Sequence, residues 1–251
     1  MKNNSPAGRL SICACVICLF ATAACAESVQ EIIRAVDGKQ HSNTSEQKMI
    51  MHVYPSMASD AGKREFVISS VSLGDDDTFM VFEEPRTVKG MKILSKGDDR
   101  WVHFPSTGRV RKIAGESKKQ SVQGVGGDFS YEDLGGGTIE KDYRTSLIEE
   151  TDTIYRIEGI PVQNDSAYTR VIFEIEKGSY RTLKIEYYTE KEGHLKDLIF
   201  KDFTMMGGKD IARTMEMTNH NKQSRTEVRI IEAVFDKPID EKLFNPTRFY
   251  R

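Results

Sequence analysis

Apolar and polar residues alternate along most of the chain beyond residue 40, which is the pattern of strands with one buried face. In residues 182–188, for example, Leu183, Ile185 and Tyr187 share one face, and more polar residues share the other. The predicted strands are 46–54, 64–73, 78–83, 91–94, 101–104, 170–176, 182–188, 195–203, 212–219 and 226–235. Short strands at roughly regular spacing, separated by turns rich in Gly and Asp, predict one antiparallel sheet or barrel.

A helical pattern precedes these strands, in residues 28–36. Apolar residues recur there at helical spacing, Ser28 can cap the first turn, and Gly38 follows the last turn. The Gly-rich stretch 124–137 lacks a strand pattern and offers at most a helical turn. Because so little helix is available to cover a long sheet, we expect the sheet to curl and leave an apolar concave surface. Methionines on the predicted strands suit such an adaptable surface, although each could equally be an ordinary core residue.

The N-terminal residues have the layout of a secretory signal. Lys2 and Arg9 are basic, an apolar run covers residues 10–24, and no acidic residue occurs before Glu27. The run is shorter than the ~20 apolar residues of a membrane-spanning helix, so an N-terminal anchor or a buried helix is the weaker alternative. We predict a signal peptide in residues 1–25 and one exported domain in residues 26–251.

Two cleavage sites compete at the end of this signal. Residues 24–26, Ala-Cys-Ala, resemble a site that would release a soluble protein beginning at Glu27. Residues 22–25, Thr-Ala-Ala-Cys, resemble a lipobox that would leave Cys25 as a lipidated N-terminus, although Thr22 stands where Leu is usual. We favour lipidation, and in either case we predict a periplasmic protein, free or anchored to a membrane through Cys25.

The positions of the cysteines and the net charge exclude several classes of function. All four cysteines, at positions 13, 15, 18 and 25, lie in or at the end of the predicted signal. The exported domain therefore has no disulfide, no Cys metal ligand and no Cys nucleophile, and its core alone must stabilise it. Two of the 36 Lys and Arg residues lie in the signal, which leaves 34 against 38 Asp and Glu and a net charge near −4. Such a chain is not expected to bind nucleic acid.

The short motifs of catalysis and metal binding are missing from the chain. Its five histidines have neither H-E-x-x-H nor H-x-H spacing, so we predict no metal site, although a zinc or copper site could still form in space. The run Asp75, Asp76 and Asp77 lacks the rest of a calcium loop, and the glycines from Gly124 lack the ending of a phosphate loop. Since a G-x-S-x-G nucleophile is also missing, we predict no cofactor and no enzymatic activity.

Two stretches of the chain resemble the LolA-like family of outer-membrane lipoprotein-sorting proteins. Residues 100–113 read R-W-V-H-F-P-S-T-G-R-V-R-K-I and are similar to the family's W-x-Y-x-P…R-V-R-R-I block. Residues 127–134 read G-D-F-S-Y-E-D-L and match the family's G-[ST]-D-F-[ST]-Y-E-D-L block from Asp128 onward. Weaker similarity in residues 180–196, where Thr182 replaces the usual Pro, and in 213–219 and 243–244 extends the resemblance over most of the exported domain.

This resemblance implies a fold and a function. The implied fold is mainly β (α+β): a single curved antiparallel sheet that forms an incomplete β-barrel, with helices covering the open side. The implied function is to bind lipid or lipoprotein acyl chains in the apolar concavity for transfer toward the outer membrane, with an inner-membrane transporter or permease as a partner. The alternative is a periplasmic sensor of mislocalised lipoproteins, and lipidation at Cys25 would favour such a tethered, partner-binding protein.

Candidate site residues come from the predicted strands and from the two blocks. The predicted lipid-facing wall comprises Met80, Phe82, Ile93, Trp101 and Ile185, each of which could equally be core sealed beneath a helix. The predicted polar-aromatic loop comprises Asp128, Phe129, Tyr131, Asp133 and Leu134, with Arg109 and Arg111 nearby in sequence. This loop could be a lid latch or a partner-docking surface, or it could be fixed in place by an Arg–Asp network.

Overall fold

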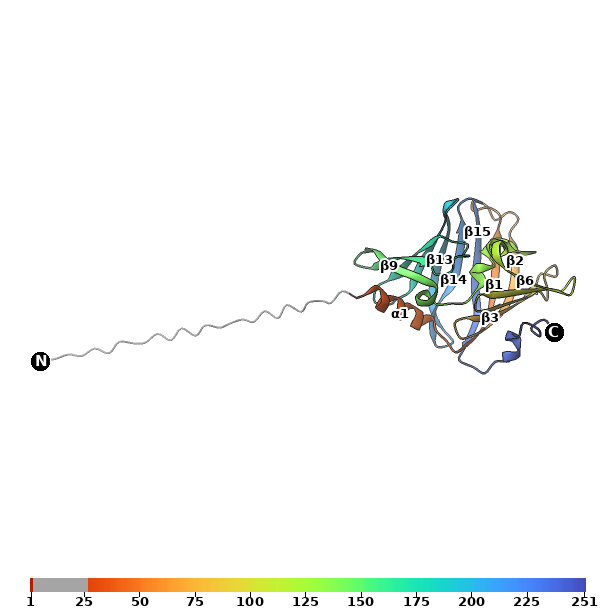
Figure 1. Ribbon diagram of the computed structural model, residues 1–251, viewed down its shortest axis with the longest axis horizontal. Helices are drawn as coiled ribbons and strands as arrows, with labels where there is room; N and C mark the ends of the chain where they lie inside the picture. The colour runs from red at the N-terminus through yellow and green to blue at the C-terminus, as the bar shows by residue number, and fades with distance from the viewer. Residues whose placement is uncertain (2–26) are drawn as a thin grey trace.

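The computed structural model describes Met1 and residues 27–251, so the predicted signal peptide, its cleavage sites and Cys25 lie outside the described residues. Thirteen strands form one curved antiparallel sheet in the order β6-β5-β4-β3-β2-β1-β15-β14-β13-β12-β11-β10-β9 (Figure 1). Their bounds are β1 (Thr44–Tyr54), β2 (Arg64–Leu73), β3 (Asp77–Glu84), β4 (Lys92–Lys96), β5 (Asp99–Phe104), β6 (Arg109–Ile113), β9 (Tyr143–Glu150), β10 (Ile154–Pro161), β11 (Arg170–Glu176), β12 (Thr182–Thr189), β13 (Gly193–Met206), β14 (Lys209–Asn219) and β15 (Ser224–Phe235). The sheet does not close into a barrel, because β6 and β9 remain as edges, and the predicted fold class is confirmed.

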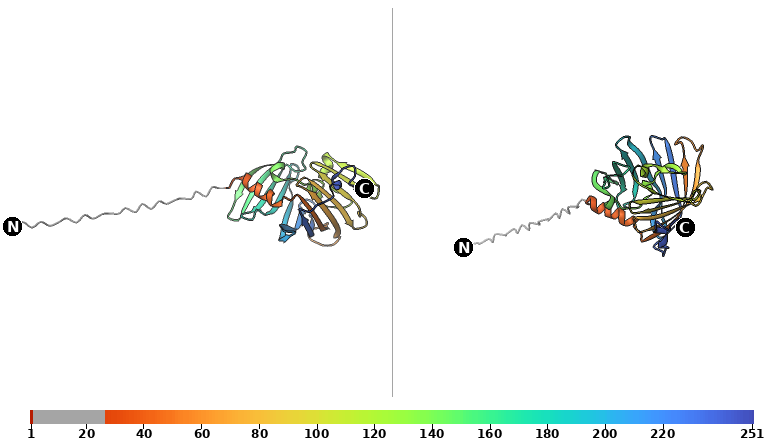
Figure 2. Two further views of the ribbon diagram at one scale, coloured as in Figure 1. Left: turned by 90° about the horizontal axis from the view of Figure 1, so that it is seen from below. Right: turned by 45° about the vertical axis from the view of Figure 1, so that its right-hand side comes forward.

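Each half of the sheet is a meander of hairpins that follow one another in sequence. The first and last of the thirteen strands, β1 and β15, pair at the centre, with Ser45 opposite Phe235 and Tyr54 opposite Arg225. This pairing joins the β1–β6 half to the β9–β15 half, and the curved sheet surrounds a concave face (Figure 2).

The longest helix among residues 27–251, α1 (Val29–Gln40), covers part of the concave face. Ser28 and Glu31 form a capping box at its start: the Ser28 hydroxyl accepts from the Glu31 amide, and the Glu31 carboxylate accepts from the Ser28 amide. The helix runs four residues beyond the predicted end, through Gly38, because a glycine is tolerated inside a helix whose apolar face is buried. That face packs on β10–β13.

A second cover is the crossing segment, residues 114–138, which leaves the sheet after β6. It contains η1 (Gly115–Lys119), the short hairpin of β7 (Ser121–Val122) and β8 (Gly126–Ser130), and η2 (Glu132–Leu134), and it leads through α2 (Ile139–Asp142) into β9. Its strand β8 contacts β1, β14 and β15, so the segment crosses the middle of the concave face.

Three apolar clusters form the core, and all are built from residues 27–251. One packs β1, β2 and β3 against the crossing segment, and the second packs α1 on β10–β13. Phe129 and Met215 contact both, so these two clusters meet at the middle of the concave face. On the opposite face, the C-terminal Phe244 and Phe249 pack on Phe79 and Leu94, after η3 (Glu241–Phe244) has turned the chain back.

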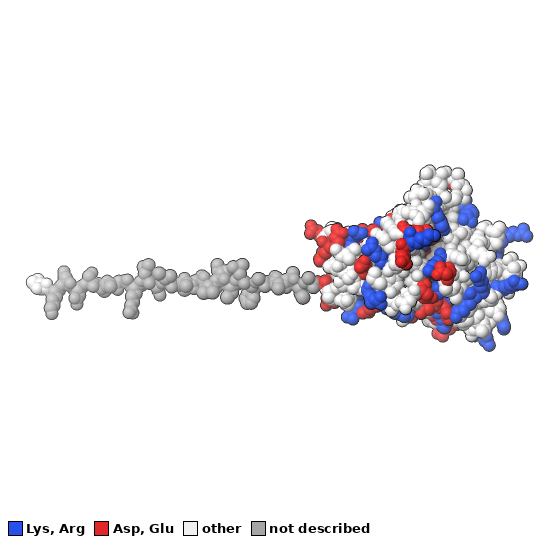
Figure 3. All heavy atoms as spheres, turned by 45° about the horizontal axis from the view of Figure 1, so that its top comes forward, with Lys and Arg blue, Asp and Glu red and all other residues white. Residues whose placement is uncertain are grey.

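The predicted strands omit β6, β9 and β10, although β10 has the alternation of a half-buried strand. The two edge strands are mostly exposed on both faces, so they lack the alternation that marks a half-buried strand. On the face shown in Figure 3, acidic and basic side chains are interspersed. Among the described residues, no helix is long and apolar enough to span a membrane.

Candidate functional site

An apolar cavity of about 280 Å³ lies between the concave face and the crossing segment. Four methionines contribute to its wall: Met49 and Met51 from β1, Met80 from β3 and Met215 from β14. The remaining apolar wall comes from Ile68, Phe82, Val122, Val125, Phe129, Leu134, Leu198 and Val228. Because the methionine side chain is unbranched and polarizable, this wall can adapt to apolar guests of irregular shape.

The first polar anchor of the crossing segment is Asp128, whose side chain points to β15. The hydroxyls of Ser224 and Thr226 donate to its two carboxylate oxygens at 2.5 and 2.8 Å. The Asp128 amide in turn donates to the Thr226 hydroxyl at 3.0 Å. Asp128 is 3% exposed and Thr226 1%, so these bonds form away from water, where a missing partner would leave a costly unpaired group.

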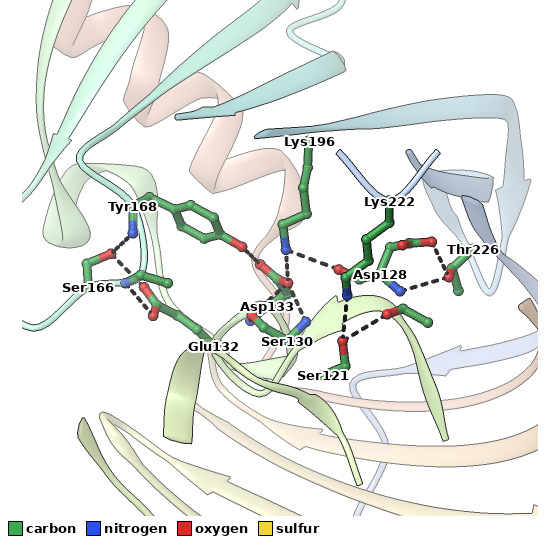
Figure 4. A network of polar contacts seen from close by, with 12 residues as sticks. Ser121, Asp128, Ser130, Glu132, Asp133, Ser166, Tyr168, Lys196, Lys222 and Thr226 are labelled. Atoms are coloured by element: carbon green, nitrogen blue, oxygen red, sulfur yellow. Dashed lines mark hydrogen bonds and ion pairs between the residues drawn. The ribbon is translucent and has the colours of Figure 1, made fainter. Parts of the chain in front are cut away.

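The second anchor is Asp133, which binds a buried lysine (Figure 4). The Lys196 ammonium of β13 donates to the Asp133 carboxylate at 2.7 Å and to the Asp128 carbonyl at 3.1 Å. The Tyr168 hydroxyl donates to the same carboxylate at 2.6 Å, and so do the amide and hydroxyl of Ser130, at 2.6 and 2.8 Å. The Lys196 and Asp133 side chains are only 4% and 3% exposed.

Its surroundings favour the ionised form of the buried Asp133 carboxyl. Burial alone would raise the pKa of the Asp133 carboxyl, but the Lys196 ammonium and the surrounding donors outweigh burial and hold that pKa below its usual value. Burial and the Asp133 charge together raise the pKa of the Tyr168 phenol well above its usual value, so this phenol stays a proton donor.

A third anchor, Glu132, joins the segment to the loop before β11. Its carboxylate accepts from the Ser166 hydroxyl at 2.6 Å and from the Ala167 amide at 2.7 Å, while its carbonyl accepts from the Arg100 guanidinium at 3.3 Å. We call the carboxylates of Asp128, Glu132 and Asp133, with the side chains and amides that bind them, the clasp. The clasp ties the crossing segment to β13, to β15 and to the 166–168 loop.

Comparisons with known proteins agree with this geometry. A family model described as an uncharacterized protein matches residues 74–251. A solved domain that carries the name of an outer membrane lipoprotein-sorting protein, from Vibrio parahaemolyticus, is 29% identical, with 88% of this chain and 96% of that one covered and a TM-score of 0.77. The chain belongs to the LolA-like family.

Two further structures share this LolA-like fold. A DUF1329 family protein from Desulfovibrio piger is 23% identical over 86% of this chain and 95% of its own, with a TM-score of 0.77. A LolA superfamily protein from Nitrosomonas europaea is 19% identical over 88% of this chain and 98% of its own, with a TM-score of 0.73. Among curated proteins, none matches the chain.

In the LolA-like domain, the residues predicted for a lipid-facing wall lie in different places. Met80 and Phe82 line the cavity, and Ile93 is buried in the same cluster behind its wall. Ile185 packs in the cluster beneath α1. Trp101 lies on the opposite face of the sheet, under the Lys112 ammonium at 5.4 Å, because Val102 takes the inner face of β5. Trp101 and Ile185 therefore do not line the cavity.

The residues of the two sequence blocks also lie in different parts of the structure. Phe129 and Leu134 line the cavity, and the Tyr131 hydroxyl accepts from the Gln123 amide at 3.0 Å inside the crossing segment. Arg109 and Arg111 lie exposed on the edge strand β6, where Arg111 donates to Ser117 at 3.3 Å. The partners of the clasp carboxylates are therefore lysine, tyrosine, serine and threonine side chains, and not these arginines.

Sequence analysis does not single out Lys196, Tyr168 or Thr226 as site residues. Lys196 belongs to the weaker stretch of LolA-like similarity, which is the one signal that could have marked it. Thr226 stands at the start of a predicted strand with no feature that separates it from a surface residue.

Proposed function

We propose that this protein is a carrier that binds an acyl chain of a lipid or lipoprotein in the methionine-lined cavity for transfer toward the outer membrane. The observation that carries the proposal is the cavity itself, about 280 Å³ of largely apolar space on the concave face of a LolA-like sheet. Sheltering an acyl chain from water gains ~0.8 kcal/mol for each CH2 that is buried. A cavity of this lining therefore has a physical reason to take up an acyl chain.

The clasp supports the proposal because it holds one wall of the cavity in place before a ligand arrives. Asp128 is fixed from β15 and Asp133 from β13, and the residues that follow them in the chain, Phe129 and Leu134, face the cavity. A preformed wall reduces the ordering that binding would otherwise require. We propose that the clasp positions this wall of the cavity, of which Asp133 itself forms part.

Lipid content of the purified protein tests the proposal. Residues 27–251 would be secreted to a bacterial periplasm, purified without detergent, extracted with organic solvent and analysed by mass spectrometry. Stoichiometric phospholipid or acyl peptide is the expected result, and it would identify the class of cargo. A lipid-free protein that also takes up no fluorescent fatty acid would contradict the carrier and would favour the lipoprotein sensor.

Two matched variants direct this test to the cavity. Ser70 on β2 lines the cavity and is 7% exposed, so Ser70→Phe should fill part of the space and displace bound lipid. Ser69→Phe is the control, because Ser69 lies on the opposite face, where its hydroxyl donates to Glu83 at 2.6 Å. We expect Ser70→Phe to lose most of the lipid and Ser69→Phe to retain it.

The cell-envelope location and the donor of the cargo belong to the same proposal. The predicted signal in residues 1–25 would bring the domain to the periplasm, free or held by lipidated Cys25. An inner-membrane transporter or permease is the partner that a carrier in this location needs as its source of cargo.

A further inference from the structure

Two histidines and an aspartate meet on the outer face of the sheet, away from the cavity. The Nε2 atom of His194 lies 2.8 Å from Oδ1 of Asp197, and Nε2 of His220 lies 3.1 Å from Oδ2 of the same carboxylate. The ligand atoms of the three residues lie within 4.8 Å of one another. The imidazole rings of His194 and His220 are 4.6 Å apart, centroid to centroid.

A β-bulge creates this meeting. Residues three apart on a regular strand point to opposite faces, which would separate His194 from Asp197. However, Tyr188 pairs with His194 while Tyr187 pairs with Lys196, so one extra residue is inserted in β13 between these pairs. This insertion returns His194 to the face that carries Asp197.

Packing orders the His194 imidazole, and a backbone hydrogen bond places His220 beside it. Tyr188 stacks on the His194 ring at 4.9 Å and an angle of 19°, and the Arg170 guanidinium lies 4.1 Å from the centre of the Tyr188 ring. The His220 amide donates to the Leu195 carbonyl at 2.9 Å, which holds the end of β14 beside β13. His194 and Asp197 therefore come from β13, and His220 comes from the turn after β14 that this bond holds beside β13.

We propose that His194, Asp197 and His220 form a binding site for a divalent transition-metal ion such as Zn²⁺. Two imidazole nitrogens and one carboxylate oxygen are a ligand set that zinc accepts, with water in a fourth position. Tetrahedral bonds of ~2.0–2.2 Å place ligand atoms roughly 3.3 Å apart, close to the present contacts with Asp197. Small side-chain rotations would suffice to admit the ion, in exchange for the protons on the two nitrogens.

A neighbouring lysine sets the strength of the site. The Lys184 ammonium lies 3.2 Å from Oδ1 of Asp197 and 3.1 Å from Oε1 of Glu186. It neutralises the carboxylate in the metal-free protein and repels an incoming cation. The histidine side chains are 36% and 34% exposed, so an ion can reach them from solvent.

Zinc titration of residues 27–251, tag-free and stripped with EDTA, tests the proposal by isothermal titration calorimetry. We expect one saturable site, binding roughly tenfold or more weaker in His194→Ala, His220→Ala and Asp197→Asn, and binding several-fold tighter in Lys184→Met. The control is His41→Ala, because His41 contacts Asp75 at 2.9 Å but belongs to no three-ligand group in the described part of the chain.

The zinc measurements can fail or succeed independently of the carrier proposal. A zinc-dependent rise in melting temperature that disappears in His194→Ala and His220→Ala would support the site even if folding of a variant is weakened. Absence of saturable binding, or equal affinity in these variants and in His41→Ala, would overturn it. The lipid content of the cavity does not enter either measurement.

Discussion

The two halves of the concave face are covered by different means. Over β10–β13, α1 inserts Ile32, Ile33 and Val36, which are at most 1% exposed, so side chains fill the space between helix and sheet. Over β1–β3, the crossing segment is anchored through the carboxylates of the clasp, and a cavity of about 280 Å³ remains beneath it.

This difference shows how a fold can cover an apolar surface without filling it. Apolar side chains gain stability by removing area from water, at roughly 25 cal/mol per Å², so a cover held by them closes onto the sheet. Hydrogen bonds instead fix a cover at the distance and direction that their geometry demands. Asp128 and Asp133 are held by β15 and β13, and their anchoring leaves room over β1–β3.

Breaking the clasp should have the largest effect on stability. Lys196→Met removes the ammonium and leaves the Asp133 carboxylate buried without its charged partner, so we expect the free energy of unfolding to fall by about 3–5 kcal/mol. Urea denaturation followed by circular dichroism measures this change. Lys201→Met on the same strand is the control, because Lys201 and Glu216 form an exposed pair at 3.1 Å that is worth about 0–1 kcal/mol. Equal losses in the two variants would refute the role of the clasp.

Shortening a buried side chain of α1 should destabilise the β9–β15 half of the sheet without changing the lipid content of the protein. Ile33→Ala removes a side chain that is 1% exposed between α1 and the sheet, and we expect a loss of about 3 kcal/mol. Lipid content per folded protein should stay unchanged, since Ile33 does not line the cavity. If Ile33→Ala also empties the protein of lipid, the two covers do not act separately.

A smaller loss should follow from Gly127→Ala, in the strand that carries Asp128. Gly127 has a φ of +80°, and an added Cβ would lie 2.9 Å from the Thr226 hydroxyl oxygen that binds Asp128. We expect a loss of about 1–3 kcal/mol from backbone strain plus this crowding. Gly208→Ala is the matched control, since Gly208 has a φ of +85° with nothing within 4 Å of an added Cβ. Because the Cβ would also lie 3.1 Å from Cγ2 of Val53, a melting temperature lower for Gly127→Ala than for Gly208→Ala isolates the crowding against Thr226 and Val53 from the backbone strain.

Much of the fold can be predicted because its signals are local. Alternation marks the half-buried strands, and the spacing of Ile32, Ile33 and Val36 marks α1. The edge strand β9 escapes detection, since most of its residues are exposed and alternation disappears.

The clasp and the group of His194, Asp197 and His220 could not be predicted from the sequence, for a different reason. A lysine in an alternating strand is expected on the surface, yet Lys196 shares the buried face of β13 with Leu198, and the bulge turns only His194 outward. The partners of Lys196 lie about 60 residues away in sequence, and only the fold brings them together.

Acid should weaken the clasp through the Asp133 carboxylate. The pKa of Asp133 is below its ordinary value of 3.8, because the Lys196 ammonium and its other donors outweigh the effect of burial. The folded protein therefore binds a proton less readily than the unfolded chain. The resulting stability, about 1.4 kcal/mol for each unit of pKa difference, is fully present above pH 3.8 and is lost as the pH falls through the lower folded-state pKa.

Asp133→Asn makes this acid effect measurable, because the amide does not titrate. We expect the difference in unfolding free energy between the unmodified protein and Asp133→Asn to be constant near neutral pH and to shrink below about pH 4. The corresponding difference for Ile33→Ala should not change with pH, since no ionisable group is removed there. A pH-independent difference for Asp133→Asn, measured by urea denaturation down to pH 3, would show that Asp133 does not titrate in unfolding and that charge does not hold the crossing segment.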